Sequence, residues 1–278
     1  MGLRSGGGAG TYPARPLSVK DLWACWPAIH NKIHSRKTKF LFLDFDGTLT
    51  AIAKTPHAVV LKRKTRETLQ RLSRLPSYRI AIVSGRSLKN LQKYFNLKNV
   101  IYVGNHGLEI KGQGLTAPAI AKKAKKLEAL TWLLGEKLKA EFIDMPGVYV
   151  EDKNYTLSIH YRNISVRHFP SFREAIDLFR KKHTLWPFVW NRGKKVWEVR
   201  PCLRWGKGEA VLHLLEKSSH SLPIAIGDDV TDEDMFRAVK RNGITIRVGR
   251  SKKSLAEYYV KSPQAVDRFL KKLSNAKT

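Results

Sequence analysis

Short apolar runs alternate with stretches of helical periodicity along the first part of the chain. Residues 39–45 (KFLFLDF), 78–85 (YRIAIVSG) and 99–107 (NVIYVGNHG) are rich in branched and aromatic side chains, which is typical of buried strands. Between them, residues 63–75 and 87–95 repeat apolar side chains at helical spacing. Strands that alternate with helices in this way predict a parallel sheet with crossover helices.

The alternation breaks after the third of these strands. The pattern predicts a long helix over 118–140, two antiparallel strands over 147–162 joined by the turn EDKN, and a helix over 166–182. Two further strands, 186–191 and 195–200, flank the turn RGK. These elements form an α+β segment and do not continue the parallel sheet.

The earlier alternation then returns. Helices over 208–217 and 232–241 alternate with strands over 223–227 and 244–249. A last helix is expected to begin at Ser262-Pro263, because proline is favoured in the first turn of a helix.

This pattern divides the chain into three parts. Residues 36–112 and 200–278 are expected to form one α/β core with a parallel sheet, and residues 113–199 an inserted α+β domain. Residues 1–35 begin with a glycine-rich stretch that lacks the apolar centre of a secretory signal. We expect them to be a flexible extension with a possible short helix.

Composition adds a strong basic excess. The 278 residues include 52 Lys and Arg against 23 Asp and Glu, a formal net charge of +29. This excess favours anionic partners, but no nucleic-acid-binding motif occurs, so no specific nucleic-acid partner is expected. No run of about 18 apolar residues occurs, and the two cysteines match no metal spacing. We expect a monomeric, cytoplasmic protein with no membrane partner.

Polar side chains follow the predicted core strands at the point where each strand ends. Ligands of open parallel sheets bind beyond the carboxyl ends of the strands, so these groups are expected to meet at one edge. The polar residues at the strand ends, and at the start of the helix after the insertion, are Asp44, Asp46, Thr48, Ser84, Arg86, Asn105, His106, Lys207, Asp228, Asp229 and Asp232.

Such a set of groups suits phosphoryl transfer from an ester. One carboxylate can attack phosphorus while a second moves the proton of the leaving oxygen. A hydroxyl and a lysine can hold the other oxygens, and a hard cation such as Mg²⁺ would relieve the repulsion among the acids. The competing interpretation of Asp44 and Asp46 is a simple Asp-Gly turn at the end of the strand. That interpretation does not account for the polar groups at the other strand ends.

Several candidates also have a structural interpretation. Ser84 can belong to a simple turn, and Lys207 can be a solvated lysine. The acids of TDED (231–234) suit the positive end of a helix. His106 can be a hydrogen-bonded structural histidine, and His160 is interpreted as facing solvent.

Taken together, the motifs DFDGTL, SGR, an isolated lysine and GDDVTD resemble the four motifs of the haloacid dehalogenase (HAD) superfamily of phosphatases. The segments VGNHGLEI, GKKVWEVRP, KGEA and GDDVTDEDMF further resemble the trehalose-6-phosphate phosphatase family. The resemblance covers about residues 38–270. It implies a HAD-like Rossmannoid core with a C2B-type cap, and Mg²⁺-dependent hydrolysis of trehalose 6-phosphate to trehalose and phosphate through an aspartyl phosphate.

The resemblance also implies catalytic roles. Asp44 would be the nucleophile and a Mg²⁺ ligand, Asp46 the general acid and base with its carbonyl on the metal, and Asp228 the third metal ligand. Lys207 would neutralise the aspartyl phosphate. The other implied residues are Thr48 and Ser84, which would bind the phosphoryl group together with Lys207, and Asp229 and Asp232, which would orient the metal or its waters.

The implied sugar site lies between core and cap. In the family, a matching lysine and glutamate hold sugar hydroxyls, which assigns this role to Lys194 and Glu198. The other interpretation of these two is a surface ion pair. The residues implied to contact substrate are Arg86, Asn105, His106, Arg162, Lys194 and Glu198.

Two other functions stay open. The same chemistry could act on sucrose phosphate, mannosyl-3-phosphoglycerate or a hexose phosphate. A function of another class, a non-catalytic polyanion-binding protein on the same scaffold, would use the basic excess.

Overall fold

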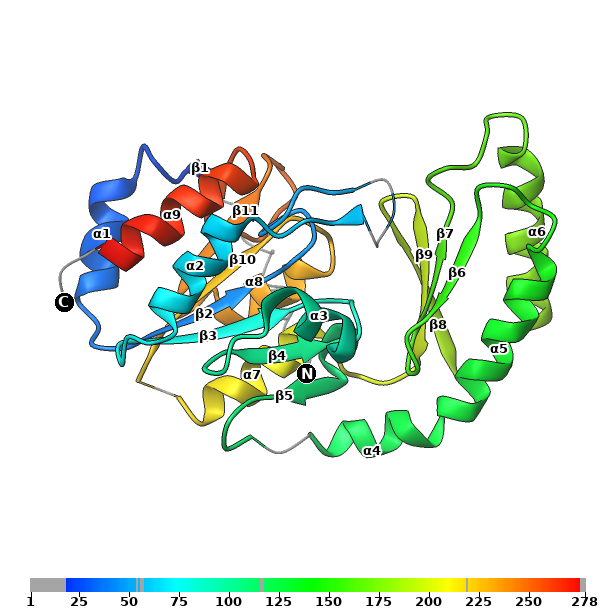
Figure 1. Cartoon of the computed structure of the whole chain (residues 1–278), viewed down its shortest axis with the longest axis horizontal. Coiled ribbons are helices and arrows are strands. Elements are labelled where there is room, and N and C mark those ends of the chain that lie inside the picture. The colour runs from blue at the N-terminus through cyan, green and yellow to red at the C-terminus, as the bar shows by residue number, and fades with distance from the viewer. Residues whose placement is uncertain (1–18, 54, 56–57, 116–117, 219, 276–278) are drawn as a thin grey trace, which may run out of the picture.

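The computed structural model describes residues 19–275, apart from residues 54, 56–57, 116–117 and 219. An eight-stranded sheet with helices on both faces lies beside a four-stranded sheet with helices on one face (Figure 1). The mainly parallel large sheet confirms the α/β class that the sequence predicts.

The large sheet has the order β1-β12-β11-β10-β2-β3-β4-β5. All neighbouring strands are parallel except β4 and β5, which pair antiparallel at one edge. The strands are β1 (Lys20–Asp21), β2 (Lys39–Leu43), β3 (Tyr78–Val83), β4 (Ile101–Gly104), β5 (Glu109–Lys111), β10 (Leu222–Gly227), β11 (Ile244–Val248) and β12 (Tyr258–Val260).

Alternation along β2 supplies both faces of this sheet with apolar side chains. Leu41 and Leu43 belong to one core cluster, and Phe40 and Phe42 to the other. The first cluster is covered by α1 (Trp26–His34), α2 (Arg63–Leu72), α3 (Leu88–Phe95) and α9 (Pro263–Asn275), and the second by α7 (Lys207–Glu216) and α8 (Asp232–Val239). None of the described helices combines the length and apolar character needed to cross a membrane.

The small sheet is antiparallel, with the order β6-β7-β9-β8. Its apolar face, which includes Ile159, Trp197 and Val199, packs against α5 and α6. Its other face is turned toward the large sheet (Figure 1). The elements of this part are α4 (Ala119–Lys126), α5 (Glu128–Glu141), β6 (Tyr149–Asp152), β7 (Leu157–His160), α6 (Phe169–Lys182), β8 (Phe188–Gly193) and β9 (Val196–Pro201).

Two predicted elements differ in the structure. The long helix predicted over 118–140 is interrupted at Leu127, which has φ −98° and ψ 0° and separates α4 from α5. The strand predicted over 99–107 ends at Gly104, because Asn105 and His106 adopt left-handed φ values of 47° and 56°. The residues Asn105–Gly107 form the short 3₁₀ helix η2 instead.

Residues 20–34 of the extension predicted over residues 1–35 pack against the large sheet. Strand β1 extends the sheet beside β12, where Lys20 pairs with Tyr258, and α1 is the expected short helix. Ile29 and Ile33 lie on one face of α1 and pack in the core of the large sheet. Their burial stabilises this segment. Residues 1–18 lie outside the described part of the chain.

Candidate active site

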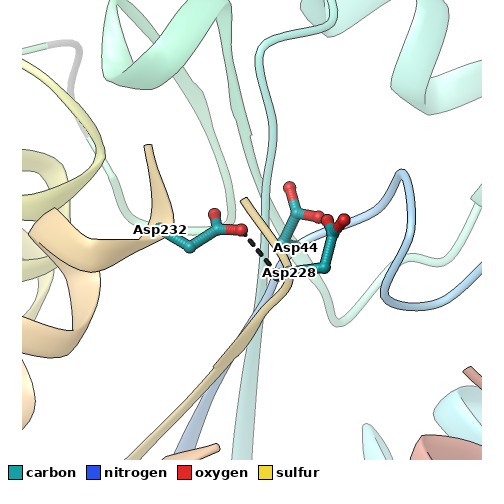
Figure 2. Close-up of side chains that lie close together, drawn as sticks. All are labelled: Asp44, Asp228 and Asp232. Atoms are coloured by element: carbon teal, nitrogen blue, oxygen red, sulfur yellow. Dashed lines mark hydrogen bonds between the residues drawn. The ribbon is translucent and has the colours of Figure 1, made fainter. Parts of the chain in front are cut away.

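Three aspartates meet where β2 and β10 end. Asp44 follows β2, Asp228 follows β10, and Asp232 is the first residue of α8 (Figure 2). One carboxylate oxygen of each lies within 4.8 Å of the others, and all three residues are buried. Parallel pairing of β2 with β10 brings Asp44 and Asp228 together although 184 residues separate them in the chain.

Lys207 neutralises part of this acidic cluster. Its Nζ lies 2.7 Å from Asp44 Oδ1 and 2.7 Å from Asp232 Oδ1, with the side chain buried. Burial disfavours the ammonium, but the two carboxylates outweigh burial and raise the pKa of Lys207. The lysine therefore stays charged against the carboxylate expected to attack phosphorus.

The aspartates carry more negative charge than Lys207 balances. Burial, together with the charges of Asp232 and Asp228, raises the pKa of Asp44 well above its ordinary value. Burial also raises the pKa of Asp228 to about 6, although Lys194 opposes the shift. Closely spaced, poorly solvated oxygen donors of this kind suit a hard divalent cation such as Mg²⁺.

Two glycines make this close approach possible. Gly47 has φ +84°, and a Cβ there would lie 2.4 Å from the carboxylate of Asp228. A Cβ on Gly227 would lie 2.3 Å from Asp232 Cγ. Asp232 Oδ2 in turn accepts hydrogen bonds from the backbone N–H groups of Asp228 (2.8 Å) and Asp229 (2.9 Å). Asp232 thus holds the loop that follows β10. Because its oxygens are engaged there, Asp44 and Asp228 are better able to ligate a cation.

The carboxylate of Asp46 is paired with Arg86 and lies outside the cluster of three aspartates. Arg86 Nε donates to Asp46 Oδ2 at 2.6 Å and Nη2 donates to Oδ1 at 2.7 Å. The hydroxyl oxygen of Ser84 accepts from the backbone N–H of Arg86 at 3.2 Å, beside the same site. Arg86, expected to face the sugar, therefore orients a carboxylate in this structure.

A cavity of about 480 Å³ lies between the acidic cluster and the small sheet. Its walls combine strand ends of the large sheet with one face of β6, β7, β8 and β9. The sequence-predicted residues that line it are Asp44, Asp46, Ser84, Arg86, His106, Arg162, Lys194, Glu198, Lys207, Asp228 and Asp229.

Thr48, to which the resemblance gives a role in phosphate binding, is not among the residues that line this cavity. A tight turn, in which the Gly47 N–H donates to the Thr50 carbonyl at 2.9 Å, carries Thr48 into the interior. The buried Thr48 hydroxyl has no hydrogen-bond partner among the described residues.

Asn105, which the resemblance implies to contact substrate, is buried and is not among the residues that line the cavity. Its amide nitrogen donates to Glu109 Oε2 (2.7 Å) and to the carbonyl of Lys153 (2.9 Å), and its oxygen accepts from Thr156 (2.8 Å). With both ends of the amide engaged, Asn105 ties the end of β4 to the β6–β7 turn.

His106 and Glu198 form a second bridge between the two sheets. His106 Nε2 lies 3.1 Å from Glu198 Oε1, and burial lowers the pKa of His106 to about 4. The imidazole is therefore neutral at pH 7 and donates Nε2–H to the carboxylate. Burial opposes ionisation of Glu198, but His106, Lys153 and Arg200 outweigh it and lower the pKa of Glu198.

Lys194 reaches across the cavity to the acidic cluster. Its Nζ lies 2.5 Å from Asp228 Oδ2, and its carbonyl accepts from Arg162 Nη2 at 2.7 Å. The predicted sugar-binding lysine is thus joined to a predicted metal ligand. Glu198, four residues on, faces His106 instead, so the two do not form the surface ion pair that was the alternative.

Sequence reasoning missed polar residues on the small sheet. Strand register sets Glu151 opposite Ser158, Ser158 opposite Glu198, and Glu198 opposite Asn191, and all four line the cavity. His160, interpreted as facing solvent, also lines it and lies 2.9 Å from Glu151. The signal was available for β7 and β9, because polar residues alternate with buried apolar ones along these two strands.

Comparison with known proteins identifies a family for this chain. The family model described as trehalose-phosphatase matches residues 42–264. A relative from Arabidopsis thaliana, probable trehalose-phosphate phosphatase H, is 32% identical over 84% of this chain and 71% of its own length. A second Arabidopsis relative, probable trehalose-phosphate phosphatase E, is 30% identical over 94% of this chain and 79% of its own.

A solved structure resembles most of this chain in fold. The C-terminal domain of the C. albicans trehalose-6-phosphate phosphatase superposes with a TM-score of 0.77 at 25% identity, covering 94% of this chain and 99% of that one. The chain therefore belongs to the trehalose-phosphatase family, a family of phosphoric monoester hydrolases with the HAD fold.

Proposed function

We propose that the chain hydrolyses trehalose 6-phosphate to trehalose and phosphate, with Asp44 as the nucleophile. The observation that carries this proposal is the contact of Asp44 Oδ1 with Lys207 Nζ at 2.7 Å, inside a buried acidic cluster that opens into a polar cavity. The substrate named for the relatives and for the solved C. albicans structure supports the choice of sugar phosphate.

The first step transfers the phosphoryl group to the protein. An oxygen of Asp44 bonds to phosphorus as the bond between phosphorus and the sugar oxygen breaks. Asp46 gives a proton to that leaving oxygen, so trehalose departs neutral and Asp44 carries an acyl phosphate. Lys207 remains beside Asp44 and offsets the charge gathered there.

The second step returns the enzyme to its starting state. Asp46 takes a proton from a water molecule, whose oxygen attacks phosphorus and displaces the carboxylate of Asp44. Phosphate leaves and Asp46 is again protonated for the next turnover. Ser84 lines the same cavity and supplies a hydroxyl for a phosphoryl oxygen.

A divalent cation such as Mg²⁺ would be held by the carboxylates of Asp44 and Asp228 and the carbonyl of Asp46, and would neutralise charge on the phosphoryl group. The fit rests on the clustered oxygens and on the raised pKa values of the two carboxylates. Asp229 and Asp232 orient this set, Asp232 through its bonds to the loop N–H groups.

The small sheet and its helices are proposed to act as a cap domain that binds the sugar. Its polar face offers hydrogen-bonding groups to sugar hydroxyls across the cavity, among them Glu198, Lys194 and Arg162. Closing this face over the substrate would keep bulk water from the acyl phosphate. The enzyme is proposed to act as a monomer.

The test is phosphate release from a panel of esters with and without Mg²⁺. Trehalose 6-phosphate should be hydrolysed faster than sucrose 6-phosphate, mannosyl-3-phosphoglycerate and glucose 6-phosphate, and only when Mg²⁺ is present. Ready release from another sugar phosphate but not from trehalose 6-phosphate would change the assigned substrate. No release from any ester would favour a binding protein over an enzyme.

A further inference from the structure

A groove of about 690 Å³ lies apart from the cavity that contains the acidic cluster. It is formed by α1, the start of α2 and the outer side of α9, and these helices lie at the end of the large sheet that is distant from the small sheet (Figure 1). Its size falls within the range of about 300–1,000 Å³ that is usual for small-ligand pockets. None of its lining residues takes part in the proposed hydrolysis.

The lining of this groove is strongly cationic. Five of its residues are basic, namely Lys62, Lys64, Arg268, Lys271 and Lys272, and His30 lies beside them. Asp267 is the one acid among the described lining residues, and its Oδ1 accepts a hydrogen bond from Thr65 at 2.7 Å. Within the described part of the chain, no carboxylate forms an ion pair with any of the five basic residues. Within the described lining, Asp267 alone offsets their mutual repulsion.

Two of these cations are held in place by aromatic rings. The guanidinium of Arg268 lies 4.4 Å from the ring centroid of Trp23, and Lys272 Nζ lies 5.2 Å from that of Trp26. Such contacts restrict long side chains that would otherwise move freely, so less freedom is lost when a ligand binds. Trp26 itself lines the groove and adds an apolar wall.

The start of α2 adds to the positive potential. Lys62 occupies the N-cap position, no side chain caps the helix, and its first turn has no acidic residue. A helix N-terminus carries partial positive charge and free N–H groups, so lysines there are unfavourable unless an anion lies nearby. Asp267, which accepts from Thr65 in the first turn of α2, supplies one negative charge there. Lys62 and Lys64 both line the groove, so a further anion bound beside them would relieve the remaining repulsion.

We propose that this groove binds a short linear oligophosphate, the chemistry shared by inorganic polyphosphate and the phosphate chain of a nucleoside triphosphate. The five basic residues are spread over α9, α2 and the N-cap residue of α2. A chain of several phosphates can therefore contact more of them than a single phosphate can. The groove is bounded by three helices, which favours a small ligand over the flat surface of a membrane.

The test measures tripolyphosphate binding to the full chain by calorimetry, in EDTA and at physiological ionic strength. EDTA removes any divalent cation that could bridge the phosphates to the acidic cluster, and the charge-reversal variants described next assign the binding to the groove. We expect one tripolyphosphate per chain, with affinity that falls as salt is raised. ATP that binds more tightly than tripolyphosphate would indicate a nucleotide ligand, and equal affinities would indicate the inorganic chain.

Charge-reversal variants distinguish binding in this groove from non-specific attraction of an anion to a basic protein. The double variant Lys64→Glu with Lys271→Glu should weaken binding by about tenfold or more. The matched control, Lys122→Glu with Lys125→Glu on α4, makes the same change in net charge at exposed lysines and should leave affinity within about twofold. Both variants should keep the wild-type melting temperature and phosphatase activity.

Three results would overturn the proposal. One is equal weakening by the two double variants, which would show non-specific attraction. Another is the absence of tripolyphosphate binding. The third is binding of single-stranded RNA through the groove without binding of tripolyphosphate or ATP, which would indicate a nucleic-acid surface instead.

Discussion

Arg86 donates to both carboxylate oxygens of Asp46, at 2.6 and 2.7 Å. Its guanidinium also lies 5.2 Å from the ring of Phe45 and 5.4 Å from that of Tyr94, while Nη1 donates to Asn90 at 2.9 Å. These contacts fix the orientation of the carboxylate proposed to move the proton. Arg86 therefore acts on the reaction through Asp46.

Replacing Arg86 with lysine should slow turnover more than it weakens substrate binding. Lysine keeps the charge but loses the paired hydrogen bonds, so kcat should fall by about 10- to 100-fold while KM changes less than about threefold. Steady-state phosphate release across pH measures both constants. Asn90→Ala, which removes one contact of Arg86 but none of Asp46, should stay within about threefold of wild type. A normal kcat in Arg86→Lys would contradict this role.

Asp44→Asn should abolish turnover and raise the melting temperature of the metal-free protein. The folded-state pKa of Asp44 is raised, so its stabilising contribution is present at low pH and is lost as pH rises through that value. Above the ordinary pKa of an aspartate, keeping Asp44 in this site therefore costs stability, and the neutral amide removes this cost while its oxygen can still accept from Lys207.

Differential scanning fluorimetry in EDTA, combined with phosphate release in Mg²⁺, tests both statements about Asp44→Asn. Asp267→Asn, at a carboxylate outside the acidic cavity, is the control and should retain activity. Measurable turnover by Asp44→Asn would exclude it as the nucleophile, and a lower melting temperature would argue against the electrostatic cost.

His106 should make the protein less stable in mild acid. The folded His106 stays neutral down to pH about 4, whereas the unfolded chain takes up a proton near its ordinary value of 6.5. Acidification over this interval therefore favours the unfolded chain, by up to about 1.4 kcal/mol per pH unit for one group. Urea unfolding at pH 7 and pH 5 measures the difference.

The variant His106→Asn should flatten this pH dependence. Asparagine tolerates the left-handed backbone at this position and does not titrate. His213→Asn, at a less buried histidine of α7, is the control for the loss of a histidine elsewhere in the fold. An equal loss of stability from pH 7 to pH 5 in wild type and His106→Asn would assign the effect to other groups.

Lys194→Ala should have opposite effects on the two ligands of the cavity. Removing the ammonium from Asp228 Oδ2 frees a carboxylate oxygen, so Mg²⁺ should bind more tightly. Loss of a cation facing the substrate should raise KM for trehalose 6-phosphate by about tenfold. Calorimetry with Mg²⁺ and steady-state kinetics measure the two effects separately.

The neighbouring lysine provides a control for Lys194→Ala. Lys195 does not line the cavity and has φ 61°, which asparagine accommodates, so Lys195→Asn should change neither constant. Weaker Mg²⁺ binding by Lys194→Ala would show that the lysine supports the metal site and does not compete with it.

Much of the fold and of the acidic site could be predicted from local sequence. Apolar runs mark the buried strands, and helical spacing marks the crossover helices. Because parallel strands end at one edge, the positions of Asp44, Lys207 and Asp228 along the chain were enough to predict that they meet. The structure brings these three together.

Choices between distant partners could not be predicted in the same way. Local pattern places Arg86 and Asn105 at strand ends, but their partners depend on which side chains lie within reach after folding. Arg86 is paired with Asp46, and Asn105 is enclosed by the β6–β7 turn. The same holds for Lys20, because its place in the sheet requires β12, which lies more than two hundred residues away.

Hydrophobic periodicity is a property of neighbouring residues, and it therefore determines where strands and helices form along this chain. The sequence also gives the order in which polar groups follow those strands. Hydrogen bonds and ion pairs act over a few ångströms between segments remote in sequence, so tertiary packing alone selects their partners. It sets Lys194 against Asp228 and aligns Glu151, Ser158 and Glu198 across the small sheet. The acidic cluster follows from strand order, whereas the polar wall opposite it follows from strand register and from how the two sheets pack.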